Sequence, residues 1–158
     1  MNIPREKEEA IRAQARHCYQ CGVCMGSCPV ARVNEAFHPR RLVREISIGD
    51  WEEILKGDTI WLCSQCHLCS AICPQGVGLS ELIVEFRNIA TDTGIKPPAA
   101  YIENMRQISA TGRLTQMSSP VARRRLKLNL KELEPAAADE IRKLVEGTKF
   151  GRLLSEDD

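Results

Sequence analysis

All eight cysteines of the chain lie in two runs, CYQCGVCMGSCP at residues 18–29 and CSQCHLCSAICP at residues 63–74. A shift of 45 residues superposes the second run on the first cysteine by cysteine, with Gln65 on Gln20 and Pro74 on Pro29. Each run reads C-x2-C-x2-C-x3-C-P, which is the spacing of bacterial-type iron–sulfur sites. The repeat therefore predicts two [4Fe–4S] clusters.

The spacing within each run also predicts which cysteines share a cluster. Three thiolates at every third residue of a tight loop face inward and bind three corners of one cube. The fourth cysteine precedes a proline, which cannot continue a helix and favours an extended conformation for that cysteine. In two-cluster proteins this fourth cysteine ligates the other cube, so insertion of the clusters and folding are coupled. The predicted ligand sets are Cys18, Cys21, Cys24 and Cys73 for the first cluster, and Cys63, Cys66, Cys69 and Cys28 for the second.

Three other uses of eight cysteines fit this pattern less well. Zinc ribbons pair two C-x2-C knuckles and need no third or fourth cysteine in each run. Disulfides need an oxidising compartment, whereas dense cysteine in a reducing one indicates metal. A cluster with one open iron takes three protein thiolates, but each run here supplies four. A structural zinc module stays the alternative from a different functional class.

The composition excludes several classes of protein. Of the 158 residues, 43% are apolar and 27% charged, as in an ordinary globular chain. No apolar stretch approaches the roughly 18–20 residues of a membrane span, and the N-terminus lacks the apolar core of a secretory signal. The net charge of +1 gives no general attraction to nucleic acid. These features predict a cytoplasmic protein. Aromatic residues make up only 4%, and two bulky clusters would account for the missing core volume.

Helical signals occupy the rest of the chain, without strand alternation. Pro39 at a first helical position, an apolar stripe and Gly49 predict a helix over residues 39–49. Asp50 and Glu53 form a capping box for a short helix that ends at Gly57. Further helices are expected from a cap at Ser80 to Gly94, from Pro97 to Gly112, and from Pro135 to Gly147. The predicted fold class is all-α.

The sequence predicts a two-cluster domain at residues 1–112 and a helical extension at residues 113–158 that serves in partner docking. A basic segment of the extension has no acidic residue among its five charges: Arg123, Arg124, Arg125, Lys127 and Lys131. A solvated face, a docking patch for an acidic partner and a nucleic-acid site are the alternatives, and no groove-reading motif supports the last. The apolar residues Phe150, Leu153 and Leu154 belong either to a frayed tail or to a docking element.

No catalytic site is predicted. Gly76 and Gly78 are followed by Glu81 where a dinucleotide-binding loop has glycine. All eight cysteines are used as ligands, and no Ser/His/Asp set has a recognisable spacing. His17 and His67 adjoin ligand cysteines, so they either couple a proton to reduction or have solvent-facing or structural roles. A chain with two one-electron centres and no substrate site is expected to pass electrons between partners.

The paired runs, the helical insert between them and the stretch IWLCSQCHLCSAICPQGV at residues 60–77 resemble the C subunit of heterodisulfide reductase. The resemblance covers roughly residues 15–110. The cysteine motif alone is shared with iron–sulfur subunits of succinate dehydrogenase, fumarate reductase, glycerol-3-phosphate dehydrogenase and glycolate oxidase. Those proteins carry an additional [2Fe–2S] domain or cysteine-rich CCG modules, which this chain lacks.

The resemblance implies an α-helical ferredoxin fold and a place in an oxidoreductase complex of the kind found in methanogenesis. It implies two partners, which are an A subunit that contains flavin and iron–sulfur clusters, and a B subunit with CCG domains that reduces the disulfide. A similar relay in a heterodisulfide-reductase-like complex of sulfur metabolism, and a stand-alone ferredoxin, are the alternatives.

Overall fold

The computed structural model describes residues 3–49, 51–115, 117–131 and 138–155, and all regular structure within these ranges is helical. The all-α prediction is therefore confirmed for the described part of the chain. Contacts divide the chain into two units, Met1–Pro97 and Pro98–Asp158. No helix of the described ranges is long and apolar enough to cross a membrane.

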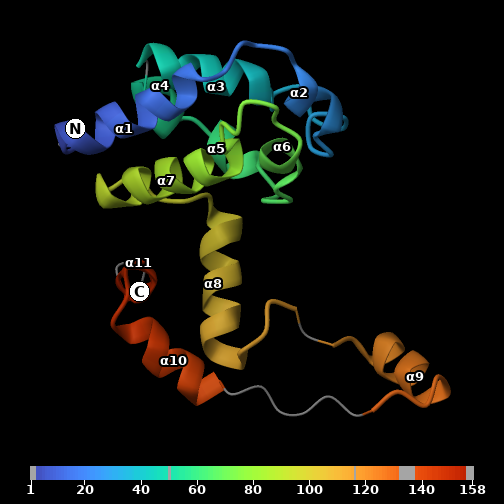
Figure 1. The fold of residues 1–158 in the computed structure, drawn as a ribbon. Helices are drawn as coiled ribbons and strands as arrows, with labels where there is room; N and C mark the ends of the chain where they lie inside the picture. The colour runs from blue at the N-terminus through green and yellow to red at the C-terminus, as the bar shows by residue number, and fades with distance from the viewer. Residues whose placement is uncertain (1–2, 50, 116, 132–137, 156–158) are drawn as a thin grey trace. The chain divides into compact units, whose positions relative to one another are not determined.

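The first unit contains both cysteine runs, each of which includes a short helix (Figure 1). Helix α1 packs against α3, α2 against α6, and α4 and α5 against α7. The two runs are thus brought together by short helices, α2 and α6, that lie far apart in the sequence. The helices of this unit are α1 (Arg5–Arg16), α2 (Val23–Ser27), α3 (Pro39–Ile48), α4 (Trp51–Lys56), α5 (Thr59–Leu62), α6 (Leu68–Ala71) and α7 (Leu79–Asp92).

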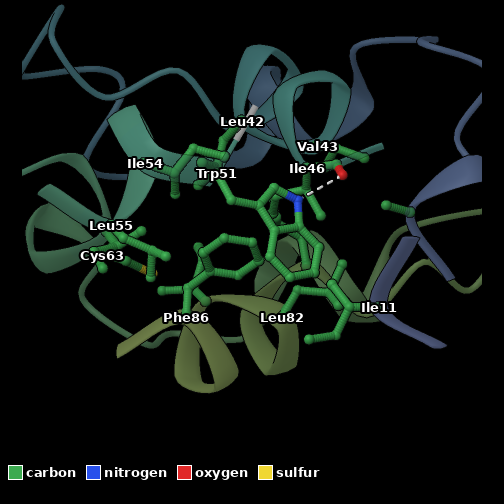
Figure 2. Close-up of a cluster of buried hydrophobic side chains, with 14 of the residues drawn as sticks. Ile11, Leu42, Val43, Ile46, Trp51, Ile54, Leu55, Cys63, Leu82 and Phe86 are labelled. Carbon is green, nitrogen blue, oxygen red and sulfur yellow. Dashed lines mark hydrogen bonds between the residues drawn. The ribbon is translucent and has the colours of Figure 1, made fainter. Parts of the chain in front are cut away.

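The core of this unit lies between α3, α4 and α7. Trp51 packs edge-on against Phe86, with ring centroids 5.0 Å apart, and its indole nitrogen donates to the carbonyl of Ile46 at 3.0 Å. Figure 2 shows the two rings at the centre of the apolar cluster. The apolar stripes that the sequence predicts are buried here. They comprise Leu42, Val43 and Ile46 of α3, with Leu82, Ile83, Phe86, Ile89 and Ala90 of α7.

The predicted ends of α3 are confirmed, whereas the predicted start of α7 is wrong. Pro39 begins α3, and Gly49 ends it in the left-handed conformation, at φ +88°. Gly78, not Ser80, precedes α7, and Ser80 lies inside the helix, fully buried. The Ser80 hydroxyl bonds to other side chains and does not cap the helix. Asp50, the predicted cap of α4, lies outside the described residues.

The second unit contains α8 (Ala99–Thr111), α9 (Ser119–Lys127), α10 (Ala138–Glu146) and α11 (Lys149–Ser155). Helices α8, α10 and α11 pack against one another. Gly112 ends α8 at φ +69°, as predicted. The contact division assigns α8 to the second unit, whereas the domain boundary predicted from the sequence places it in the first domain. The boundary at residue 112 stays a prediction, and residues 135–137 of the last predicted helix lie outside the described ranges.

Candidate metal centre

The repeat in the sequence is also a repeat of backbone conformation. Gln20 and Gln65 occupy equivalent positions, and both adopt positive φ, at 64° and 54°. The next equivalent pair, Gly22 and His67, is left-handed too, at 82° and 60°. The amide hydrogen bonds follow the same pattern, because Met25 donates to the carbonyl of Gly22 at 2.9 Å as Ser70 donates to that of His67 at 3.1 Å. Each run therefore winds through the same tight loop into a short helix.

The first loop surrounds a cavity. Its walls include apolar side chains such as Val43 and Val77, together with the exposed Arg40. Two cysteines of the second run reach this cavity, Cys69 and Cys73. With the three leading cysteines of the first run, the cysteines lining it are Cys18, Cys21, Cys24, Cys69 and Cys73.

The second loop surrounds a second cavity. Phe37 and Ile83 form part of its apolar wall. The last cysteine of the first run, Cys28, lines this cavity and not the one that its three sequence neighbours line. The cysteines lining the second cavity are Cys28, Cys63, Cys66 and Cys69.

The two cavities meet at Cys69 and Leu79. Of the eight cysteines, all of them within the described ranges, Cys69 lines both cavities, and Leu79 of α7 also lines both. In the described part of the chain, no three His, Cys, Asp or Glu side chains converge closely enough for a single metal ion. The thiols instead lie around two adjacent spaces.

Burial favours the protonated form of several of these thiols. Burial raises the pKa of Cys24 to about 11. Burial also raises the pKa of Cys63 and of Cys69. Since thiolates are the metal ligands, these groups lose their protons when a positively charged group binds. All eight thiols are free, so the donor set fits iron–sulfur clusters.

Several N–H groups point at the sulfurs. The backbone amide of Ala31 donates to Cys28 Sγ at 3.4 Å, and that of Val77 to Cys73 Sγ at 3.5 Å. The side-chain amides of Gln20 and Gln65 donate to the first cysteine of their runs, at 3.3 Å and 3.6 Å. Such donors stabilise negative charge on sulfur and tune the reduction potential. The 45-residue repeat marks the two glutamines as equivalent, but it does not predict these contacts with sulfur.

Arg87 of α7 holds the start of the second run. Its guanidinium donates to the carbonyl of Ile60 at 2.7 and 2.9 Å and to that of Cys63 at 2.7 Å. It also lies over the Trp61 ring, 5.4 Å from the centroid. Its charge favours the thiolate of Cys63 and so opposes the effect of burial on the pKa of that thiol. Sequence reasoning missed this residue, because it lies 24 positions from Cys63 without any motif.

A polar network adjoins Cys69. The Glu81 carboxylate accepts hydrogen bonds from Ser70 at 2.6 Å and from Ser80 at 3.0 Å, and the two hydroxyls are 2.5 Å apart. These bonds, with Ser70 the largest contributor, lower the pKa of Glu81 to about 2. His67 Nδ1 lies 3.4 Å from the same carboxylate. His67 and His17 are both exposed.

Comparison with known proteins agrees with this geometry. A family model described as a 4Fe-4S dicluster domain matches residues 14–77. The chain is 32% identical to the iron-sulfur C subunit of CoB--CoM heterodisulfide reductase from Methanopyrus kandleri, over 96% of this chain and 80% of the relative. It is 32% identical to the second form of the corresponding C subunit in Methanocaldococcus jannaschii, over 94% and 82%. It is 30% identical to a protein of Archaeoglobus profundus named as similar to the C subunit of heterodisulfide reductase, over 87% and 74%. The dicluster match and the eight cysteines together give the chain two [4Fe–4S] clusters.

Proposed function

The chain belongs to the family of the iron–sulfur C subunit of heterodisulfide reductase, and from this premise we propose that it is the electron-transfer subunit of such a complex. In this proposal electrons pass through its two clusters between a flavin-containing A subunit and a disulfide-reducing B subunit. The chain then holds no catalytic residue for the disulfide. Its place in the cytoplasm stays a prediction from composition.

The observation that carries the proposal is the exchange of cysteines between the two cavities. We assign Cys18, Cys21, Cys24 and Cys73 to one cluster, and Cys63, Cys66, Cys69 and Cys28 to the other. Cys73 supports this assignment by lying among the cysteines of the first run, and Cys28 by lying among those of the second. Each cluster then takes a ligand from both runs, so the clusters are adjacent and the fold depends on both.

The chain's own residues support a relay in three ways. Apolar side chains such as Val43, Val77 and Ile83 line the cavities and limit access of water to the sulfurs. Cys69 lies on the wall common to both cavities, so the path between the two sites is short. Cys21 and Cys66 are exposed, one at each cavity, so each site has an edge that a partner can approach. Bound clusters supply one-electron chemistry at these positions.

The function is tested with anaerobically purified protein. We expect a brown protein with about eight irons per chain that co-purifies with larger subunits. After reduction by dithionite, the clusters should reoxidise when the heterodisulfide is added to the complex, and not when it is added to the isolated chain. A colourless protein with two zinc ions would contradict the proposal.

A variant that lacks one ligand tests whether the relay needs both clusters. Cys28→Ala removes one predicted ligand and leaves seven thiols, so the variant is expected to keep one cluster and to lose heterodisulfide-dependent reoxidation. A stand-alone ferredoxin predicts a different result, in which the wild-type chain elutes as a monomer and no larger chain accompanies it.

A further inference from the structure

Helix α9 is a well-formed helix that ends in a defined turn. Pro120 lies in its first turn. At its C-terminus, Asn129 adopts φ +50°, and the amide of Leu130 donates back to the carbonyl of Arg125 at 3.1 Å. The guanidinium of Arg125 donates to the carbonyl of Lys131 at 2.9 Å. The local sequence therefore closes this helix by itself.

The apolar side chains of α9 and its following turn are uncovered. Leu126 is 74% exposed, Leu128 61% and Val121 50%. Side chains of this kind are ordinarily buried, and here several gather on one short segment. The helix thus presents an apolar surface that has no cover within the described part of the chain.

Three of the four charged side chains of α9 lie on the other side. At 100° per residue, Arg123, Arg124 and Lys127 share one arc, while Val121 and Leu126 fall on the opposite arc. Arg125 would interrupt the apolar arc, but its guanidinium is turned back to the Lys131 carbonyl. The helix is therefore amphipathic, with a basic face and an apolar face.

These two faces select among the possible ligands. Nucleic acid would neutralise the basic face and leave the apolar face in water. A membrane surface binds a helix with a broad apolar face rich in Trp, Phe or Leu, whereas the apolar arc of α9 contains one valine and one leucine as its large side chains. A protein groove with an apolar floor and acidic walls covers both faces at once.

We propose that α9, with the turn through Lys131, docks into an acidic groove of a neighbouring subunit in the chain's own oxidoreductase complex. The inference rests on the proposed function, because it takes the partner to be a subunit of that complex. Arg123, Arg124 and Lys127 meet the acidic walls, and Val121 and Leu126 meet the apolar floor. Leu128 lies at the border between the two faces.

The test compares variants of the full-length, cluster-loaded chain for association with the subunits that co-purify with the wild type. Arg123→Glu combined with Lys127→Glu should weaken association at least about tenfold, because like charges then face each other. The wild-type association should also weaken as salt rises. Leu126→Ser combined with Leu128→Ser should weaken association by a similar factor without lowering thermal stability, because both side chains are already exposed.

Two control variants outside α9 test whether these effects are specific to this helix. Leu144→Ser on α10 removes a leucine with the same 74% exposure, and Arg44→Glu reverses an exposed charge on α3. Both should associate as the wild type does. Iron content and reduction potentials should be unchanged in every one of these variants.

Three outcomes would overturn the inference. The first is association of the α9 variants equal to that of the wild type. The second is binding to phosphatidylglycerol-containing vesicles, and the third is binding to duplex DNA, in either case lost in the α9 variants while association with the other subunits stays intact. Failure of the proposed function looks different, since the wild-type chain would then carry no iron or would co-purify with no larger chain.

Discussion

In the first cysteine run the left-handed residue before the short helix is Gly22, whereas the second run has His67 at the same position. The second run is also held by Arg87 and flanked by the network of Ser70, Ser80 and Glu81. The position equivalent to Ser70 in the first run is Met25, which has no hydroxyl. The two runs therefore share cysteine spacing and backbone course, while their surroundings differ. The repeat accounts for the binding of two clusters. The unrepeated neighbours can give these clusters different reduction potentials.

Removal of single cysteines should have the largest effect, because it should remove one of the two clusters and leave the other. Cys73→Ala and Cys18→Ala should each reduce iron from about eight to about four per chain, because both remove ligands of one predicted cluster. The double variant that combines Cys18→Ala with Cys73→Ala should lose no more iron than either single variant. Iron analysis and electron paramagnetic resonance spectra of the reduced proteins provide the measurement.

The matched double variant pairs cysteines of different predicted clusters. Cys18→Ala with Cys28→Ala should remove both clusters, although the two residues belong to one run. If this pair kept one cluster and the pair of residues 18 and 73 kept none, each run would hold its own cluster and the exchanged ligation would be wrong.

Arg87 provides the next largest expected effect. Arg87→Gln cannot reach the carbonyls of Ile60 and Cys63, which lie in buried residues. Loss of hydrogen bonds from a charged donor should reduce the free energy of unfolding by about 2 kcal/mol. It should also lower the reduction potential of the cluster in the second cavity, because a nearby positive charge is lost. Anaerobic urea unfolding and redox titration measure the two effects.

Arg40 is the matched control for Arg87. It lines the first cavity but is exposed, so Arg40→Gln should lower the potential of the other cluster with little change in stability. Equal shifts of both potentials in either variant would mean that each arginine acts on the protein as a whole.

The Glu81 network predicts a smaller, pH-dependent contribution to the free energy of unfolding. The pKa of Glu81 in the folded chain is about 2, below the ordinary 4.5, so its contribution is present above about pH 4.5 and is lost as the pH falls toward 2. The side chain is 55% exposed, and solvent screening keeps this contribution below about 1 kcal/mol. Glu81→Gln should therefore be slightly less stable near neutral pH.

Unfolding of the wild type and of Glu81→Gln at several pH values measures this difference. The gap between them should narrow below about pH 4.5. A gap that widened in acid would contradict the assigned sign.

The left-handed positions give the smallest expected effects. His67→Gly should relieve a backbone cost of about 1 kcal/mol, partly offset by loss of the contact with Glu81. Gly22→Ala should introduce a similar backbone cost without a steric clash, because a Cβ there meets Arg40 only at ordinary contact distances, 3.7 and 3.8 Å. Thermal unfolding under argon measures both. Destabilisation by His67→Gly would show that its side chain, and not its backbone, matters.

Much of the metal centre is predictable from the sequence because its determinants are local. The cysteine spacing depends on turn geometry within a dozen residues, and it indicates both the ligand type and the number of clusters. The stripe of α3 and its ends at Pro39 and Gly49 follow from helical periodicity and from the backbone preferences of proline and glycine. The match at Gln20 and Gln65 was visible, but its consequence for the sulfurs was not.

The sequence by itself determined the helical class, the eight thiols and their grouping in two equivalent loops. Only the tertiary structure decided that Cys69 borders both cavities, that Arg87 binds the carbonyl of Cys63, and that Ser80 is buried in a network and caps nothing. The reason is physical. Periodicity and turn chemistry act over a few residues, whereas the hydrogen-bond partner of a buried carbonyl or hydroxyl depends on which distant helix packs beside it.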